Sequence, residues 1–430
     1  MARHSPLSRR SFLRRTAALG APLVLSPVAL GRDGKVPPSD RVAMAFVGTG
    51  SHGIGRNLRM FCGQRDARVV ALCDVDRNHL ARGVATAKQR RPQEAEGCLV
   101  TGDFRPILDR ADVDGVMIST PDHWHVPISV AAVRAGKDVI CEKPTLTVAE
   151  GRVLADTVAR YGAVFQMSTE DRSVAVYHRM AELVRNGRIG RLQRIQVVLP
   201  AGPGGAGDPA PRPVPEELDY EMWLGPAPYA PYCPGRVHRQ FRFVRDYSGG
   251  ELTDWGSHLL DTAQWANDTE RTGPVEIEGT GKRHHRGLYD TYYQYRIHYR
   301  YASGVRMEVR SGGVGIRFEG TDGWVGNSGW RGRLEASSQD LLHTRIGPSE
   351  VHLFTCRAGE HRNFLDCVKS RRDPYFPAEI GHRCCSVAHL GNIAIDLGRK
   401  LTWDPRSERF PGDEAANRLL SRAMRAPWTV

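Results

Sequence analysis

The feature that most constrains the fold of this chain is a regular alternation of short apolar runs and helical patterns between residues 41 and 167. Short links between these elements favour parallel strand–helix–strand units, whose helices cover both faces of one sheet. The sequence therefore predicts an α/β, doubly wound parallel sheet. Its strands are expected at 41–47, 68–73, 113–119, 139–141 and 163–167, and its helices at 53–62, 77–88, 126–135 and 148–161.

A different pattern follows beyond about residue 173. Strand-like runs are separated by glycine-containing turns, which predicts a mostly antiparallel sheet with one covered face. We divide the chain into a signal and linker (1–38), a first domain (39–170) and an α+β second domain (171–430), whose final helices pack back on the first. The second domain is expected to hold strands at 192–199, 275–279, 292–301, 305–310, 315–319 and 324–325, and helices at 177–186, 250–265, 360–369 and 379–397.

The N-terminal segment has the pattern of an export signal. Ser8-Arg9-Arg10-Ser11-Phe12-Leu13 is a twin-arginine motif, and an apolar stretch interrupted by Pro22 and Pro27 follows it. That stretch is shorter than the roughly 20 residues that span a bilayer. We therefore expect the twin-arginine export machinery as a partner, a periplasmic or other extracytoplasmic location, and no membrane span in the mature protein. A disordered basic tail is the alternative.

Charge and cysteine content narrow the function classes. Basic residues exceed acidic ones by 12, and five of the arginines lie in the first 31 residues, which contain no acid. The remaining bases are spread along the chain and not grouped with aromatics, which argues against a nucleic-acid partner. The nine cysteines show no C-x-x-C spacing and no paired framework, which predicts buried thiols and no disulfides.

A glycine-rich turn joins the first predicted strand to the first predicted helix. In Gly48-Thr49-Gly50-Ser51-His52-Gly53, the first glycine permits a tight bend, the second lets backbone approach a pyrophosphate, and the third lets the helix pack closely. The helix N terminus offers free N–H groups to phosphate. The turn predicts dinucleotide binding by Gly48, Gly50, Ser51, His52 and Gly53. An ordinary glycine-rich loop is the alternative.

Asp74, at the end of the second predicted strand, indicates which dinucleotide binds. A carboxylate accepts hydrogen bonds from a ribose diol and repels a 2′-phosphate, so NAD is expected and NADP is less favoured. Arg77 nearby could receive a phosphate, which leaves NADP open. Asp74 could also serve only as the cap of the following helix.

Two further strand ends carry polar residues that should reach the same crevice, because ligands of such sheets bind at the carboxyl ends of the strands. The segment 120–125 follows one strand, and Glu142-Lys143-Pro144 follows another. A metal is not expected, since no third ligand follows the histidine pair in 120–125 at a recognisable spacing. The expected cofactor contacts are Thr120, Pro121, His125, Glu142 and Lys143, and the expected substrate contacts are Asp122 and His123. His125 could instead only begin the next helix.

Asp254, His258 and Asp261 have the spacing of one helical face. A carboxylate beside an imidazole orients it and raises its basicity, which suits a general base for a hydroxyl proton. A helix-face histidine satisfied by a local carboxylate is the alternative. We also take Trp255, Asp261 and Arg172 as candidate substrate contacts.

With these residues in view, the chain resembles the Gfo/Idh/MocA oxidoreductases, the family of glucose–fructose oxidoreductase and inositol dehydrogenase. The resemblance rests on the glycine turn, Thr120-Pro121-Asp122, Glu142-Lys143-Pro144 and Asp254 with His258, and it runs from about Arg41 to the end. It implies a Rossmann domain, a C-terminal domain with an open sheet, and a homo-oligomer (dimer or tetramer). It also implies Lys143, His258 and Asp254 as the catalytic residues.

One departure from the family pattern stands out. Relatives usually carry glutamine and a neutral or basic residue before an arginine, where this chain has Glu170 and Asp171 before Arg172. Two acids at this place are expected to alter the contact with substrate or nicotinamide.

The resulting hypothesis is hydride transfer between a sugar, polyol or glycoside hydroxyl and a tightly bound nicotinamide cofactor. His258 takes the hydroxyl proton, Asp254 orients His258, and Lys143 stabilises the developing alkoxide. Burial is expected to lower the pKa of Lys143 enough for a proton-relay role. The alternatives are an NAD-dependent, redox-neutral glycoside hydrolase and a non-catalytic sugar or dinucleotide sensor.

Overall fold

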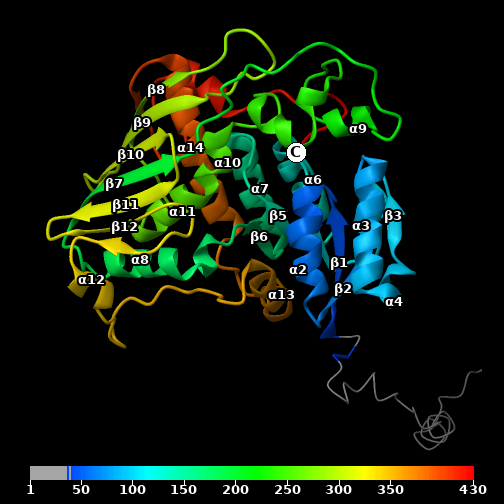
Figure 1. Cartoon of the computed structure of the whole chain (residues 1–430), viewed down its shortest axis with the longest axis horizontal. Helices are drawn as coiled ribbons and strands as arrows, with labels where there is room; N and C mark the ends of the chain where they lie inside the picture. Colours follow the sequence, from blue (N-terminus) through cyan, green and yellow to red (C-terminus); the bar gives the residue numbers. More distant parts are fainter. Residues whose placement is uncertain (1–35, 38–39) are drawn as a thin grey trace, which may run out of the picture. The chain divides into compact units, whose positions relative to one another are not determined.

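Two β-sheets organise the protein, whose computed structural model describes residues 36–37 and 40–430 (Figure 1). Residues Val42–Val430 make up one compact unit. The twin-arginine motif and the apolar stretch after it lie outside the described residues. Among the helices that are described, none is long and apolar enough to cross a membrane.

The first sheet has six strands in the order β3-β2-β1-β4-β5-β6, and every neighbouring pair is parallel. The chain starts in the middle, moves to one edge and returns past β1, so the strand order reverses between β1 and β4. This order confirms the predicted doubly wound sheet and places a crevice at the reversal. The strands are β1 (Val42–Val47), β2 (Ala67–Cys73), β3 (Leu99–Thr101), β4 (Gly115–Ile118), β5 (Asp138–Glu142) and β6 (Phe165–Ser168).

Helices cover both faces of this sheet, as the burial of β1 shows. All six residues of β1 are buried. Ala43, Ala45 and Val47 belong to one apolar cluster, and Met44 and Phe46 belong to another. Because side chains of a strand alternate between faces, two separate clusters mean that each face has its own helical cover.

Two helices of this half differ from the prediction. The helix expected at 53–62 begins as a π-helix, η3 (Gly53–Leu58), and continues as α2 (Arg59–Cys62). Helix α6 begins at Asp122, four residues earlier than expected, because Pro121 serves as its N-cap. The other helices are α3 (Arg77–Arg90), α4 (Pro92–Ala95), α5 (Arg105–Leu108) and α7 (Val148–Tyr161).

The second sheet has eight strands in the order β13-β12-β11-β7-β10-β9-β8-β14. All pairs are antiparallel except β7 with β10, which confirms the mostly antiparallel sheet. The strands are β7 (Leu192–Leu199), β8 (Glu276–Lys282), β9 (Gln294–Arg300), β10 (Arg306–Ser311), β11 (Gly315–Gly320), β12 (Trp324–Ser328), β13 (Glu335–Ala336) and β14 (Leu401–Thr402).

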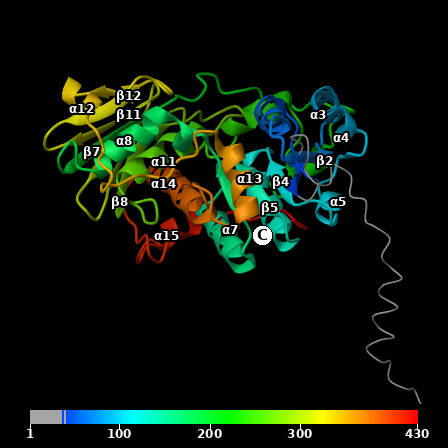
Figure 2. The ribbon, with the colours of Figure 1, turned by 90° about the horizontal axis from the view of Figure 1, so that it is seen from below.

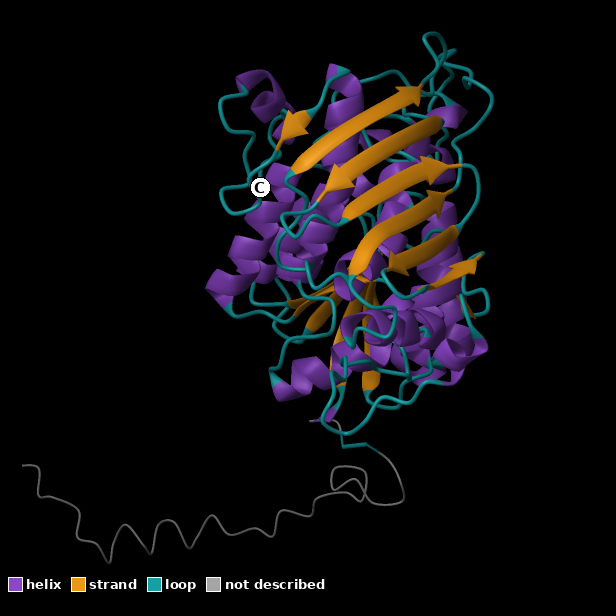
Figure 3. Cartoon of the chain, turned by 90° about the vertical axis from the view of Figure 1, so that its left-hand side faces the viewer, coloured by secondary structure: helices purple, strands orange, loops and turns teal. Residues whose placement is uncertain are grey.

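One face of this sheet is covered and the other is open. In β9, Tyr295, Ile297 and Tyr299 are buried, and the residues between them are exposed. Figure 3 shows the sheet from the side that carries no helix. The helices of this half are α8 (Ala175–Arg185), α9 (Tyr220–Leu224), α10 (Glu251–Asp254), α11 (Gly256–Ala266), α12 (Gln339–His343), α13 (Glu360–Ser370), α14 (Ala378–Leu397) and α15 (Glu414–Asn417).

Helix α14 lies beside α7 and joins the two halves (Figure 2). Arg152 of α7 forms ion pairs with Glu379 at 2.7 Å and with Glu408 at 2.6 Å. The close approach of α7 and α14 brings the second half of the chain over the carboxyl ends of the first sheet.

The nine cysteines of the chain are all free thiols, and only Cys98 and Cys356 are partly exposed.

Candidate active site

A cavity of about 610 Å³ lies at the carboxyl ends of the first-sheet strands, and residues of the second half close its other side. This volume is within the usual range for small-molecule and cofactor sites. Most residues singled out in the sequence line it. These are Gly48, Gly50, Ser51, His52, Gly53, Asp74, Thr120, Pro121, Asp122, His125, Glu142, Lys143, Asp254, Trp255 and His258.

The glycine turn has the geometry that its spacing predicted. Gly48 has φ +93°, and a Cβ there would lie 2.4 Å from the carbonyl oxygen of Ser119. A Cβ on Gly53 would lie 2.2 Å from the carbonyl oxygen of Gly48. At Gly50 the nearest atom to an added Cβ is Nδ1 of His79, at 3.7 Å. Two glycines therefore permit tight packing, while a Cβ on Gly50 would make only an ordinary van der Waals contact with the His79 ring.

Asp74 is fixed beside this turn. Its Oδ2 accepts a hydrogen bond from the backbone N–H of Thr49 at 2.6 Å, and its Oδ1 accepts one from the N–H of Asp76 at 2.9 Å. The helix cap is Asp76, so a capping role for Asp74 is excluded. Arg77 donates to the carbonyl of Glu216 at 2.5 Å and does not line the cavity. The cationic side chain that left NADP open is thus engaged elsewhere.

Glu142 links the glycine-turn helix to the end of β5. Its Oε1 accepts a hydrogen bond from Nδ2 of Asn57 at 2.9 Å and lies 3.1 Å from Nε2 of His52. Burial alone would raise the pKa of Glu142, but His52 and Asn57 outweigh it and the pKa is lowered. Glu142 is therefore an anion that holds the first turn of the helix against the strand end.

Lys143 points into the cavity and meets Asp254, not open space. Its Nζ donates to Oδ1 of Asp254 and to the backbone carbonyl of Asp254 at 2.7 Å. Arg242 donates from Nε to the other oxygen of Asp254 at 3.0 Å. Burial would lower the pKa of Lys143, but the Asp254 carboxylate outweighs it and the pKa is raised. The expected lowered pKa is wrong, and Lys143 stays an ammonium at neutral pH.

His258 is oriented by Asp171 and not by Asp254, which corrects the prediction from helical spacing. Its Nδ1 lies 2.6 Å from Oδ2 of Asp171, and the two side chains are 9% and 1% exposed. The i, i+4 spacing misled because Lys143 and Arg242 take up the Asp254 carboxylate, while Asp171 meets Nδ1 of His258. Asp254 and His258 still line one cavity, each with its own charged partner.

Two further acids face the Lys143–Asp254 pair. Burial, with a smaller contribution from the Asp254 charge, raises the pKa of Asp122 and of Glu251 to about 7. One carboxyl oxygen of each is buried without a hydrogen-bond partner among the described residues. Below pH 7 both acids are therefore largely neutral, and the cations Lys143 and Arg242 outnumber the anion Asp254.

Aromatic rings form the wall next to His258. The ring centroid of Trp330 lies 4.5 Å from that of His258 and 4.3 Å from that of Trp255. Trp330 follows β12 in the second sheet, and nothing in its local sequence indicates a place in the site. The local sequence around Arg242 and Glu251 likewise gives no sign that these residues belong to the site, and the sequence analysis did not predict them. Asp171 did carry a signal, because an acid there departs from the family pattern.

Four of the predicted ligand contacts have structural partners instead. Arg172 forms a buried bidentate ion pair with Asp261, at 2.7 and 2.8 Å, and neither residue lines the cavity. His123 lies at 2.9 Å from the carbonyl of Trp223 and is also outside the cavity. The expectation that these three contact substrate is corrected, because each is buried against protein. His125 lies at the cavity wall, but its ring nitrogens face backbone carbonyls at 2.8 and 2.9 Å.

Two family models match the two halves of the chain. The model described as the oxidoreductase family's NAD-binding Rossmann fold matches residues 42–169. The model of the same family's C-terminal alpha/beta domain matches residues 204–430. The chain belongs to the Gfo/Idh/MocA oxidoreductase family. Its first sheet is accordingly a Rossmann fold of the NAD-binding type.

Several known proteins are similar to the chain over part or most of its length. A glycosyl hydrolase family 109 protein of Shewanella sp. (strain W3-18-1) is 33% identical over 175 residues, which span 36% of this chain and 37% of that protein. The aldose–aldose oxidoreductase of Caulobacter crescentus, solved with glycerol, has a TM-score of 0.63 at 19% identity and covers 84% of this chain and 99% of its own.

A third relative was solved with a nicotinamide cofactor. The WlbA dehydrogenase of Bordetella pertussis, in complex with NADH and UDP-GlcNAcA, has a TM-score of 0.62 at 16% identity and covers 84% of this chain and 98% of its own. At these identities the two solved structures show a shared fold.

Proposed function

We propose that this protein oxidises a hydroxyl-bearing carbon of a sugar, polyol or glycoside, with a tightly bound nicotinamide cofactor as the hydride acceptor. One observation carries the proposal: Lys143 and His258, each held by its own carboxylate, line the same cavity as the glycine turn. A fixed cation and a fixed imidazole beside a dinucleotide-binding turn are what alcohol oxidation requires of a protein.

The residues of the cavity fit a dinucleotide. The glycine turn lines a cavity of about 610 Å³, and the hydroxyl of Thr120 is buried without a hydrogen-bond partner in the described structure. When bound, the cofactor supplies hydride acceptance and return. The glycine turn would hold its phosphates, Asp74 its ribose diol, and Thr120 and Glu142 the part nearest Lys143. The Asp74 carboxylate favours NAD over NADP.

His258 is suited to take the hydroxyl proton. Nδ1 lies 2.6 Å from the Asp171 carboxylate, which favours the neutral tautomer with its proton on Nδ1 and with Nε2 able to accept one. When Nε2 takes the proton, the imidazolium that forms is stabilised by the adjacent Asp171 carboxylate. The burial of both side chains keeps water from replacing this contact.

Lys143 is suited to stabilise the alkoxide that forms as the proton leaves. Its ammonium and the Arg242 guanidinium share one anion, Asp254, so these three groups together carry one positive charge while Asp122 and Glu251 are neutral. Preorganised charge aimed at a developing oxyanion contributes about 2.7–4 kcal/mol per donor in comparable sites. Because Asp254 already holds the Lys143 ammonium in place, the ammonium does not have to move when the alkoxide forms.

Redox-neutral glycoside hydrolysis is the second candidate, supported by the family 109 relatives and by the neutral acids. In that cycle a ring hydroxyl is oxidised, the carbon beside the new carbonyl loses a proton, and the aglycone leaves. Water then adds and the carbonyl is reduced again, with no net change in the cofactor. Glu251 lines the cavity and, with a pKa of about 7, could protonate the departing oxygen.

One experiment tests the proposal and separates the two reactions. The purified, undialysed protein is analysed by mass spectrometry for bound dinucleotide, and is then incubated with sugars, polyols and p-nitrophenyl glycosides. NADH absorbance without nitrophenol release supports the dehydrogenase, and nitrophenol release without net NADH supports the hydrolase. Ligand-dependent binding with no turnover in either assay would contradict both and favour a sensor.

We also propose export by the twin-arginine route to an extracytoplasmic location. The support is the Arg9-Arg10 motif, since that route carries proteins already folded with their cofactor. Tight cofactor retention follows from this proposal, because free NAD is not expected outside the cytoplasm. A protein that loses its dinucleotide on dialysis would contradict it.

A further inference from the structure

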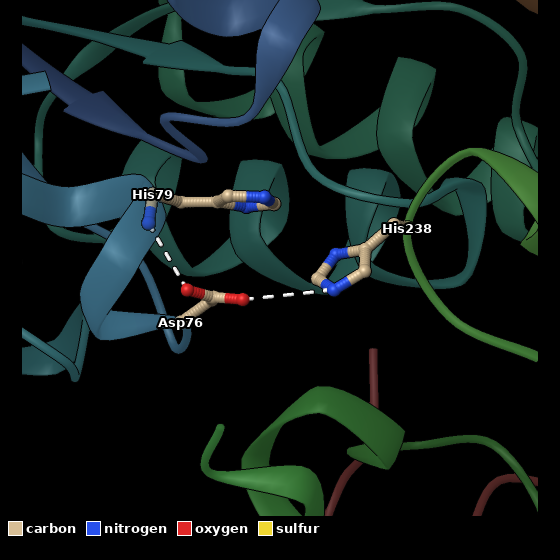
Figure 4. Close-up of side chains that lie close together, drawn as sticks. All are labelled: Asp76, His79 and His238. Atoms are coloured by element: carbon tan, nitrogen blue, oxygen red, sulfur yellow. Dashed lines mark hydrogen bonds and ion pairs between the residues drawn. The ribbon is translucent and has the colours of Figure 1, made fainter. Parts of the chain in front are cut away.

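Three side chains that commonly ligate metals meet at one end of the cavity, away from Lys143. They are Asp76, His79 and His238 (Figure 4), and one ligand atom from each lies within 4.8 Å of the others. Nε2 of His238 is 3.6 Å from Oδ2 of Asp76, and the two imidazole centroids are 4.6 Å apart. The cluster follows β2, whereas Lys143 follows β5, two strands beyond the central β1. None of the three takes part in the hydroxyl chemistry.

Two of these groups are held on a rigid scaffold. Asp76 caps helix α3, because its Oδ1 accepts hydrogen bonds from two backbone N–H groups of the first turn at 2.8 and 3.0 Å. Its Oδ2 is left to face His238. The backbone on either side of Asp76 pairs with residues 217–219 through two hydrogen bonds of 2.9 Å. His79 stands on the first turn of the same helix, so its position relative to the carboxylate is fixed.

The third group comes from a distant segment. His238 begins the 3-10 helix η6 (His238–Phe243), and its φ of +54° is unusual for a residue other than glycine. The charged groups that face His238 are the carboxylates of Asp76 and Asp74 and the guanidinium of Arg82. Two carboxylates against one guanidinium give a net negative charge around His238, which favours the binding of a cation.

We propose that Asp76, His79 and His238 bind a divalent transition metal, Zn²⁺ by preference, which ties residues 238–243 to helix α3. Two imidazole nitrogens and one carboxylate oxygen form a ligand set that Zn²⁺ takes, with a fourth position for water. Calcium and magnesium prefer all-oxygen sets. The inference goes beyond the proposed function. Nδ1 of His79 also lies 3.8 Å from Oδ2 of Asp74, the proposed ribose contact, so the metal would sit beside the bound dinucleotide and the titration is made on protein whose dinucleotide content is measured.

The geometry needs only a small adjustment to close. Zinc–ligand bonds of about 2.0–2.1 Å put neighbouring ligand atoms of a tetrahedral site about 3.4 Å apart. The present separations are at most 4.8 Å, so the atoms must move together by little more than 1 Å. His238 has a side chain that is 44% exposed and can supply most of that movement by rotation.

Metal titration of the full chain tests the site. Chelator-treated protein is titrated with ZnCl₂ by calorimetry and with CoCl₂ by absorption of the d–d bands. The variants are His79→Gln, which keeps helix propensity, and His238→Asn, since asparagine tolerates positive φ. The control is His298→Asn, a half-exposed histidine on the open sheet face.

We expect one equivalent of Zn²⁺ in the natural protein and in the control, and at least tenfold weaker binding in both site variants. The Co²⁺ spectrum should lose its tetrahedral intensity in those two variants only. A natural protein that binds neither ion, or site variants that bind as tightly as the control, would overturn the proposal. Thermal melts without metal show whether each variant is folded before the comparison is made.

Discussion

Replacing Asp171 with asparagine isolates the contact that decides where the proton sits on His258. Oδ2 of Asp171 lies 2.6 Å from Nδ1 of His258, and neither side chain is more than 9% exposed. Asparagine keeps the size of the side chain and removes its charge. The second oxygen, Oδ1, is buried without a hydrogen-bond partner in the described structure, so the new amide can take either orientation.

The two orientations set the range of the expected effect. If the amide oxygen faces Nδ1, the hydrogen bond stays but its acceptor is no longer charged. A hydrogen bond to a charged group contributes about 1.5–3 kcal/mol, so kcat should fall by about 10- to 150-fold. If the amide N–H faces Nδ1, the proton of His258 moves to Nε2, which then cannot accept the hydroxyl proton. Loss of the correct tautomer costs about 10⁴-fold in a comparable histidine–aspartate pair. Dinucleotide retention should not change, because Asp171 does not line the cavity.

The assay combines structure and rate. The ¹⁵N shifts of His258 report its tautomer, and single-turnover reduction of the bound cofactor by an active substrate reports the chemical step. Asp254→Asn is the matched control, because Asp254 contacts Lys143 and Arg242. The reasoning is refuted if Asp171→Asn keeps kcat within threefold of the natural protein, or if the Asp254 variant alone alters the tautomer.

Lys143→Met should lower kcat by about 10²–10³-fold, which is the effect of removing one oxyanion donor. Mass spectrometry should still find the bound dinucleotide, and an unchanged kcat would contradict the role of Lys143 in stabilising the alkoxide. Burial raises the pKa of Asp122 from 3.8 to about 7, so the natural protein loses stability as pH rises from about 4 to about 7. Asp122→Asn removes this loss and should stabilise the protein above pH 7 by up to about 4 kcal/mol. Urea unfolding of the two proteins should agree near pH 4 and diverge toward pH 7, and curves that stay parallel would argue against it. Gly48→Ala should cost several kcal/mol, because φ is +93° and the new Cβ would lie 2.4 Å from the Ser119 carbonyl oxygen. Gly136→Ala, at φ +76° with open space, should cost only about 1–2 kcal/mol in the same thermal melts, and equal losses would mean that the clash is absent.

The parts of the site that lie next to each other in the sequence were predictable. Gly48, Gly50 and Gly53 sit within one turn, and their roles depend on backbone geometry over six residues. Lys143 directly follows a buried strand, so its direction is set by the end of that strand. In both places local structure determines the position of the group, and the sequence pattern reports local structure well.

The partners of the catalytic groups were not predictable in the same way. Asp254 and His258 are four residues apart, yet their contacts are Lys143 and Asp171, which are 111 and 87 residues away along the chain. Charged groups from other segments of the chain take up both side chains. No spacing rule covers contacts between segments that far apart.

The amino-acid sequence by itself determined the doubly wound sheet and the glycine turn, and it predicted that Lys143 and His258 lie in one site. These follow from local periodicity and from glycine stereochemistry. Only the tertiary structure decided that the Asp254 carboxylate raises the pKa of Lys143, that Asp171 lies beside His258, and that Trp330 and Arg242 complete the cavity. The physical reason is that burial and charge pairing act through space, and the fold brings these groups together from both sheets.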